Sequence, residues 1–166
     1  MDSLGKKYEE KFESDWEKIP NTSIDRLYDP VGGYSGVSNI CDFIVYNFPH
    51  IIYAECKSTK GNTFSLTKWS TDKRGRESSQ YKKLKAKIGI KGVIAGLFIW
   101  FYDRDKVFFV PIATCKQMIE DGEKSVNCKK IVEKKYDKEY RIIEIPSVKK
   151  RVFMDSDYSV VLREEI

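Results

Sequence analysis

Two carboxylates and a lysine stand in two neighbouring apolar segments of the sequence. Asp42 lies inside Ile40–Tyr46, and Glu55 and Lys57 end the segment that begins with Ile51–Ala54. The two apolar segments predict two strands joined by a turn, and residues two apart on a strand point to the same side. A half-buried carboxylate is costly unless it is paired or binds a cation. Because hard cations such as Mg²⁺ take carboxylate oxygens, the pattern predicts a divalent-metal site that includes Asp42 and Glu55.

Positive charge is concentrated directly after this acidic pair. Residues 57–91 contain eleven Lys or Arg and two Asp or Glu, whereas residues 1–56 contain five and ten. A basic surface beside carboxylates favours a polyanion held against a metal site, and we expect that polyanion to be nucleic acid. A solvated basic loop and helix is the alternative. The basic residues that we expect to contact phosphates are Arg26, Lys60, Lys68, Lys73, Arg74, Arg76, Lys82 and Lys83.

The segments before the acidic pair must bring further side chains to it. Apolar residues recur at helical spacing over residues 3–18 and predict a helix with one apolar face. Glu9 lies on this helix and could point into the site. Ile24–Tyr28 predicts a short strand. The glycine-rich segment Val31–Gly36 lacks the GxxxxGK[ST] pattern of a phosphate-binding loop, so we expect its glycines to allow a close approach of backbone.

The segments after the pair predict loops and then a second helix. Ser58–Thr63 is polar and predicts a loop, and residues 67–77 predict a mobile basic loop. A helical pattern begins at Ser78, which can act as its N-cap, and Gly89 closes it. Gln80 lies in the first turn, where a side chain and the positive helix end could meet a phosphate.

The rest of the chain predicts the centre and one edge of a sheet. Val93–Tyr102 is continuously apolar, which is typical of a central buried strand. Val107–Pro111 predicts the next strand, Ile112–Asp121 a helix and Arg141–Ile145 a last strand. Residues 146–166 carry no pattern that places them.

Length and composition bound the class of protein. The chain of 166 residues predicts one domain over residues 1–166, with a core over about 3–120 and a C-terminal extension over about 121–166. No segment approaches the roughly 18 to 20 apolar residues of a membrane helix. The N-terminus lacks an apolar segment of signal-peptide type, so we expect a cytoplasmic protein with no membrane partner.

Cysteine usage agrees with that location. Cys41, Cys56, Cys115 and Cys128 form no CxxC pair, and His50 is the single histidine. We expect reduced, mostly buried thiols. A zinc site built from these residues is the alternative.

The motifs resemble a known family of nucleases. An acid on one strand and Glu-x-Lys on the next, between two helices, is similar to the PD-(D/E)xK nuclease core. Gly5-x-x-x-Glu9 resembles the first-helix motif of archaeal-type and RecU-type junction resolvases. Asp42, twelve intervening residues, Glu55–Lys60 and a later Gln80 resemble RecU-type Holliday junction resolvases. Lys91–Gly96 and Phe108–Pro111 look like the phage-encoded members, and the resemblance covers about residues 3–120.

The resemblance implies an α/β fold of the restriction-endonuclease-like type, with a mixed central sheet flanked by helices. It implies a homodimeric endonuclease, dependent on Mg²⁺ with Mn²⁺ as a substitute, that nicks four-way DNA junctions symmetrically. Asp42 and Glu55 would be metal ligands, and Lys57 would orient the attacking water or stabilise the phosphorane charge. Glu9 would be a further acid and Gln80 a helper near the site. Cellular members carry a long stalk insertion before the acid-bearing strand, which this chain lacks.

Aromatic residues in and near the basic segment could add to the recognition of a branched substrate. Trp69, Tyr81 or Tyr34 could stack on bases that are exposed at a branch point. A place in the core is the alternative for each ring, because aromatic side chains are more often buried there.

Besides a zinc-bound structural module, two alternatives to junction resolution remain open from the sequence. The first keeps the nuclease and changes the substrate to duplex, flap or single-stranded DNA. The second is a non-catalytic DNA-binding accessory protein of recombination that has kept the fold. Binding that is indifferent to Mg²⁺ would distinguish the accessory protein, because its residues would hold no metal.

Overall fold

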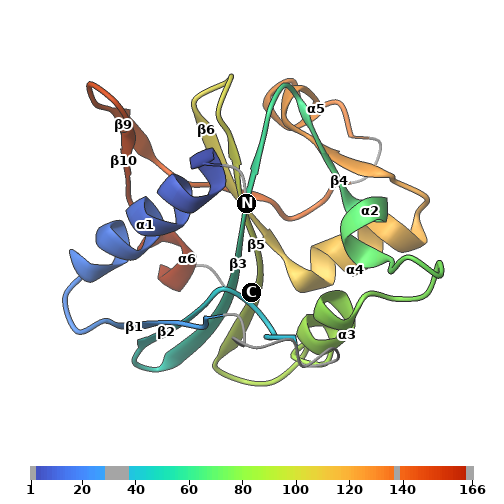
Figure 1. The fold of residues 1–166 in the computed structure, drawn as a ribbon, viewed down its shortest axis with the longest axis horizontal. Helices are drawn as coiled ribbons and strands as arrows, with labels where there is room; N and C mark the ends of the chain where they lie inside the picture. Colours follow the sequence, from blue (N-terminus) through green and yellow to red (C-terminus); the bar gives the residue numbers. More distant parts are fainter. Residues whose placement is uncertain (1–2, 29–37, 137–138, 164–166) are drawn as a thin grey trace.

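A six-stranded sheet forms the centre of the computed structural model, which describes residues 3–28, 38–136 and 139–163 (Figure 1). Its strand order is β1-β2-β3-β5-β6-β8, and β3 and β5 are parallel whereas the other neighbours are antiparallel. The strands of this sheet are β1 (Ser23–Arg26), β2 (Phe43–Asn47), β3 (His50–Thr59), β5 (Val93–Phe101), β6 (Lys106–Pro111) and β8 (Ile143–Glu144). With helices on both of its faces, the mixed sheet confirms the predicted α/β class.

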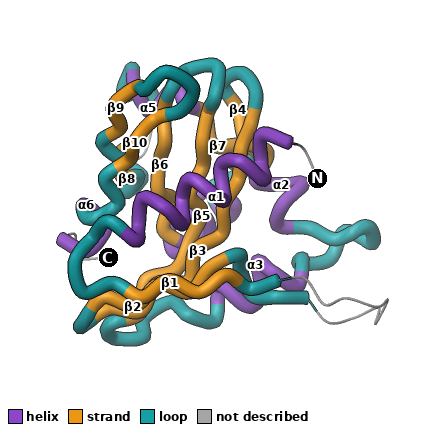
Figure 2. Tube along the Cα trace, turned by 60° about the vertical axis from the view of Figure 1, so that its left-hand side comes forward, coloured by secondary structure: helices purple, strands orange, loops and turns teal. Residues whose placement is uncertain are grey.

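One face of the sheet is covered by α1 (Ser3–Glu17), which crosses it obliquely (Figure 2). Tyr8, Phe12 and Trp16 recur every four residues, so they lie on one side of the helix and are buried against the sheet. Phe12 meets Phe43 and Phe98 with ring centroids 5.2 and 5.0 Å apart. This packing fixes the helix that carries Glu9.

The other face is covered by four shorter helices. They are α2 (Leu66–Ser70), α3 (Ser79–Lys85), α4 (Ile112–Glu120) and α5 (Cys128–Val132). Leu66, Leu84 and Met118 are fully buried there against the strand residues Leu97 and Val110. A second small sheet joins β4 (Thr63–Ser65) to β7 (Ser125–Asn127) on the same side.

The central strand β3 directs alternate side chains to these two faces. Ile52, Ala54 and Cys56 belong to the core beneath α1. Glu55 and Lys57 therefore point to the opposite face, where α2 and α3 lie. A buried carboxylate on a central strand is unusual and indicates a site rather than a packing position.

The C-terminal residues fold back onto α1. The hairpin of β9 (Ser147–Lys149) and β10 (Met154–Ser156) is followed by α6 (Val160–Arg163). Between them, Tyr158 stacks on Trp16 with centroids 5.6 Å apart and planes 10° apart. Residues that carry no placing pattern in the sequence thus complete the core beneath the first helix.

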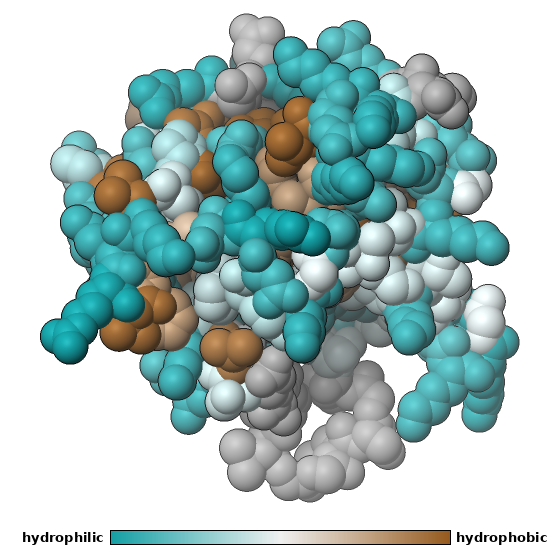
Figure 3. Space-filling view, turned by 90° about the horizontal axis from the view of Figure 1, so that it is seen from above, coloured by the Kyte–Doolittle hydropathy of each residue, from teal (hydrophilic) through white to brown (hydrophobic). Residues whose placement is uncertain are grey.

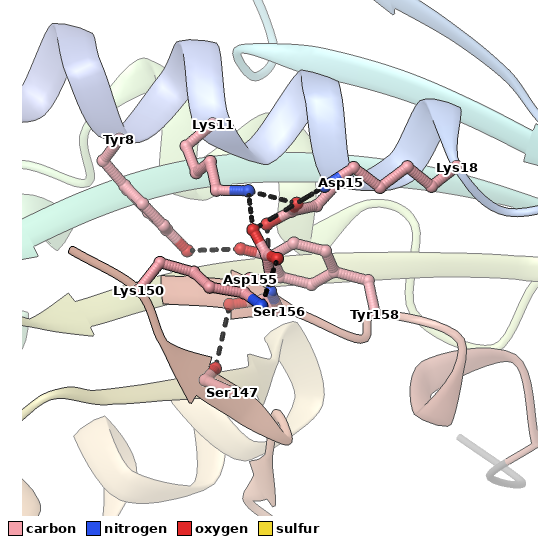
Figure 4. Close-up of polar contacts among 9 residues, drawn as sticks. All are labelled: Tyr8, Lys11, Asp15, Lys18, Ser147, Lys150, Asp155, Ser156 and Tyr158. Atoms are coloured by element: carbon pink, nitrogen blue, oxygen red, sulfur yellow. Dashed lines mark hydrogen bonds and ion pairs between the residues drawn. The ribbon is translucent and has the colours of Figure 1, made fainter. Parts of the chain in front are cut away.

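A polar network joins the C-terminal segment to α1 (Figure 4). Asp15 is buried; its Oδ1 accepts from Lys11 Nζ at 2.6 Å, and its Oδ2 accepts from the Ser156 backbone N–H at 3.0 Å. Lys11 also pairs with Asp155 at 2.6 Å, and the hydroxyls of Tyr8 and Tyr158 lie 3.3 Å apart. The buried charge of Asp15 is therefore compensated by Lys11, by Lys18 at 3.0 Å and by a main-chain donor, as burial requires.

Two strand boundaries differ from the predictions. β2 begins at Phe43, so Asp42 precedes the strand instead of lying within it. β3 extends to Thr59, because Tyr53–Thr59 pair with β5 along their whole length, and the predicted polar loop begins later than expected. Strand pairing with a neighbour far away in sequence decides both boundaries.

Two helix boundaries also differ. Residues 66–70 form α2, whereas the sequence predicts a mobile loop over residues 67–77. Ser65 caps that helix by accepting from the Lys68 N–H at 3.2 Å. α3 ends at Lys85, four residues before Gly89, although Ser78 caps its start as expected.

No helix in the described part of the chain is long and apolar enough to cross a bilayer. The glycine-rich segment Val31–Gly36 lies outside the described residues.

Candidate active site

The β2–β3 hairpin brings Asp42 next to the end of β3. The backbone N–H of Asp42 donates to the Ala54 carbonyl at 3.1 Å, and Asp42 Oδ2 accepts from the Cys56 N–H at 2.8 Å. The pairing of β2 with β3 ends at Phe43 and Ala54, so the Cys56 N–H on β3 has no partner on β2. It donates instead to the carboxylate of Asp42. The main chain of β3 therefore fixes the side chain of Asp42.

Glu55 is the most deeply buried acid of this group, with 2% of its surface exposed. Its Oε1 lies 2.9 Å from Lys57 Nζ. Its Oε2 is buried and has no hydrogen-bond partner among the described residues. Burial raises the pKa of Glu55 to about 8. The positive charge of Lys57 opposes this rise, and the negative charge of Asp42 adds to it. One carboxylate oxygen is thus left for a ligand.

Asp42 and Lys57 respond to the same environment. Burial raises the pKa of Asp42, although the Cys56 N–H and the charge of Lys57 both oppose the rise. For Lys57, burial lowers the pKa, but the negative charges of Glu55 and Asp42 outweigh burial and the net shift is upward. Lys57 therefore remains a cation beside the two carboxyl groups, with about a third of its side chain exposed.

Gln80 reaches this group from α3, and its orientation is fixed by Trp69 on α2. Trp69 Nε1 donates to Gln80 Oε1 at 2.7 Å. An indole nitrogen can only donate, so the carbonyl end of the Gln80 amide faces Trp69 and the NH₂ end faces elsewhere. The Gln80 side chain is close enough to Glu55 to lower the pKa of that carboxyl group.

Trp69, for which the sequence leaves stacking on bases and a place in the core both open, lies partly in the core. Its ring is half-buried, and its nitrogen is committed to Gln80. Tyr81, a second ring predicted to stack, is 4% exposed and packs edge-on against Trp69 at 5.5 Å. Tyr34, the third, lies outside the described residues. Since the sequence predicts a loop over residues 67–77, it carries no signal that makes Trp69 a neighbour of Gln80.

Glu9 lies at the α1 side of the site and is held by Arg26. The two form an ion pair in which both side chains are largely buried. The guanidinium of Arg26 also lies 5.7 Å from the ring centroid of Phe43, and its charge lowers the pKa of Asp42. The sequence predicts that Arg26 contacts phosphates, but in this arrangement it neutralises Glu9 because the two face each other inside the fold.

The other basic residues predicted to meet phosphates lie on the surface. Arg76 pairs with Asp72 at 3.0 Å within the turn that follows α2. Lys83 donates to the Ser38 carbonyl at 2.5 Å. The exposed members of the predicted set whose side chains have no hydrogen bond or ion pair within the described ranges are Lys60, Lys68, Lys73, Arg74 and Lys82. Their charges are available to an external anion.

The donor set fits a hard divalent cation with few protein ligands. Within the described residues, no group of three or more His, Cys, Asp or Glu side chains is arranged to hold a metal. Asp42 and Glu55 are the two carboxylates that could do so, and the unpartnered Oε2 of Glu55 is the observation that favours a cation. Mg²⁺ is usually bound through one or two carboxylates, with water and substrate phosphate completing its shell. All four cysteines are unpaired and buried, as expected for thiols of the core.

Comparisons with known proteins give a likeness in fold. No protein-family model matches the sequence, and no curated protein matches it. The chain is similar to a solved structure of Hjc, a Holliday junction resolvase of the archaeal hyperthermophile Archaeoglobus fulgidus. The two chains share 20% sequence identity and a TM-score of 0.49, over 74% of this chain and 86% of that chain.

Proposed function

We propose that this chain is a metal-dependent endodeoxyribonuclease that resolves four-way DNA junctions. One observation carries the nuclease: Glu55 is buried, one of its oxygens has no partner among the described residues, and Asp42 and the Lys57 cation lie beside it. A carboxylate in that state costs free energy unless it serves a ligand. The selectivity for junctions rests on the resemblance of the motifs around Asp42, Glu55 and Gln80 to RecU-type resolvases.

The residues divide the chemistry of phosphodiester hydrolysis among them. Asp42 and Glu55 would hold Mg²⁺, or Mn²⁺ in its place, and the bound ion would activate water and neutralise charge on the phosphate. Lys57 stays protonated and can stabilise the charge that develops at phosphorus. Removal of such an interaction typically lowers the rate by about 10²–10³. Gln80, whose amide oxygen accepts from Trp69, would act as a neutral donor beside Glu55.

The proposal includes a homodimer acting on branched DNA. Symmetric nicks in opposing strands require two sites related by a two-fold axis, which a homodimer supplies. The exposed basic residues between Lys60 and Lys82 would contact the phosphate backbone, so binding should weaken with salt.

The test is cleavage of a labelled synthetic four-way junction, with a linear duplex of the same sequence as control. Each is incubated with Mg²⁺, with Mn²⁺ and with EDTA. We expect paired nicks in opposing strands of the junction that require the metal. Glu55→Gln, which keeps the shape of the side chain, should abolish them. Glu77→Gln, an exposed acid paired with Lys85 on the surface, should not.

Each other outcome excludes part of the proposal. Equal cutting of the linear duplex would retain the nuclease and remove the junction. Tight junction binding without cleavage in either metal would favour the non-catalytic accessory protein.

A further inference from the structure

A separate basic pocket lies at the far end of β3. It has a volume of about 380 Å³ and is lined by residues from three segments that are distant in sequence. Asn62 comes from the turn after β3, Arg104 and Lys106 come from the β5–β6 turn and the start of β6, and Lys129 comes from α5. Buried Cys128 forms part of its lining.

The pocket carries uncompensated positive charge. Lys106 pairs with Glu144 at 2.7 Å. Glu133, the acid that lines the pocket, pairs with Lys135 and also feels the charge of Lys129. Arg104 and Lys129 have no ion pair or hydrogen bond from their side chains among the described residues. Two free cations from separate segments thus line one hollow, an arrangement that suits a phosphate group.

The pocket lies on the side of the sheet that carries the candidate active site. Cys128 belongs to the core beneath α2–α5, the same face to which Glu55 and Lys57 point. From Glu55 to Thr59 the strand advances roughly 13 Å, at about 3.3 Å per residue. Asn62 follows three residues later. Figure 3 views the molecule from the end where these turns lie in Figure 1 and shows that hydrophilic residues cover most of it.

We propose that this pocket binds a backbone phosphate of the DNA strand whose scissile phosphate lies at Glu55 and Lys57. A strand that follows β3 from the active site reaches Arg104 and Lys129 within a few nucleotides. The pocket would therefore fix the direction in which one DNA arm leaves the site. This inference rests on the proposed action on DNA and adds residues outside the basic segment 57–91.

The experiment measures DNA binding in EDTA, so that it does not depend on cleavage. The affinity of the full chain for a labelled four-way junction is followed by fluorescence anisotropy over a range of salt concentrations. The test variant is Arg104→Ala/Lys129→Ala. The control is Arg163→Ala/Lys116→Ala, which removes the same two charge types from α6 and α4, away from the pocket. Thermal unfolding checks that both variants are folded.

We expect the test variant to lower the slope of log K against log salt by about 0.9, the value for the one phosphate that is no longer neutralised. The control should keep the wild-type slope. An unchanged slope in the test variant, or an equal fall in the control, overturns the proposal. Inorganic phosphate that binds the wild type without any change in the DNA slope would identify a small-anion site and overturn it as well. If the wild type fails to cleave but the slope falls as expected, the nuclease is refuted and the pocket stands.

Discussion

Substitution of Trp69 by phenylalanine removes one hydrogen-bond donor and retains a ring packed against Tyr81. In the wild type, Trp69 Nε1 donates to Gln80 Oε1 at 2.7 Å, and this bond selects one of the two orientations of the amide. Without it, the amide can turn by about 180° and present its oxygen to Glu55. The donor beside Glu55 is then absent for part of the time.

The expected effect follows from the strength of that bond. A neutral hydrogen bond contributes about 0.5–1.5 kcal/mol, and about 1.4 kcal/mol corresponds to a factor of ten. Trp69→Phe should therefore slow junction cleavage by about 2- to 10-fold. The assay is single-turnover cleavage with enzyme in excess, so that changes in DNA affinity do not enter. Trp100→Phe is the control, because Trp100 Nε1 is buried without a hydrogen-bond partner among the described residues.

A double-mutant cycle separates positioning from general packing. In a Gln80→Ala background there is no amide to orient, so Trp69→Phe should then have no further effect on the rate. A rate decrease of the same size in both backgrounds would show that Trp69 acts through packing alone. Cleavage by Trp69→Phe at the wild-type rate would refute the reasoning altogether.

Three further predictions concern stability and reactivity. Tyr158→Phe removes the 3.3 Å contact with the Tyr8 hydroxyl and should lower the free energy of unfolding by about 1 kcal/mol. Tyr158→Leu also removes the stacking on Trp16 and should lower it by about 3 kcal/mol. Equal urea midpoints for the two variants would contradict this difference. A Cβ at Gly96 would collide with the Val110 carbonyl and lie 2.8 Å from Phe109 Cε2, so Gly96→Ala should lower the free energy of unfolding by more than about 1 kcal/mol. A Cβ at Gly5 has its nearest contact with Ser58 Oγ at 3.5 Å, so Gly5→Ala should leave the melting temperature unchanged or raise it. Burial raises the pKa of Cys41 to about 12 and also raises the pKa of the other three thiols, so at pH 8 the thiolate fraction is smaller than in the unfolded chain. Iodoacetamide should therefore label the native protein slowly and the urea-unfolded protein at all four cysteines. Rapid labelling of the native protein would show that the core opens.

The central part of the fold can be predicted from local pattern. Side chains alternate along a strand, so Glu55 and Lys57 must share a face, and continuous apolarity marks Val93–Phe101 as the buried neighbour. The spacing of Tyr8, Phe12 and Trp16 identifies α1 within one residue of its end. In each case the periodicity of one element and its burial agree.

Other parts of the site depend on contacts between distant segments, which pattern does not contain. Arg26 resembles a surface cation because nothing nearby in sequence pairs with it, yet it meets Glu9 seventeen residues earlier. Trp69 resembles part of a loop, because α2 has one turn and too few residues to show a helical period. The placement of Tyr158 depends on Trp16, which lies at the other end of the chain.

The buried carboxyl group of Glu55 makes the candidate site depend on packing between distant segments, because that packing must offset the cost of burying the group. A pKa raised to about 8 by burial means that the ionised form destabilises the folded chain by a few kcal/mol above that pH, and less as the pH falls toward the unfolded value. The fold must offset this cost elsewhere, and the aromatic core that Tyr158 completes beneath α1 is well placed to do so. A cation bound by Asp42 and Glu55 would act in the same direction, because a ligand that binds only the folded state stabilises it. Packing on either face of the sheet, including the aromatic core beneath α1, contributes to the net stability that offsets this cost.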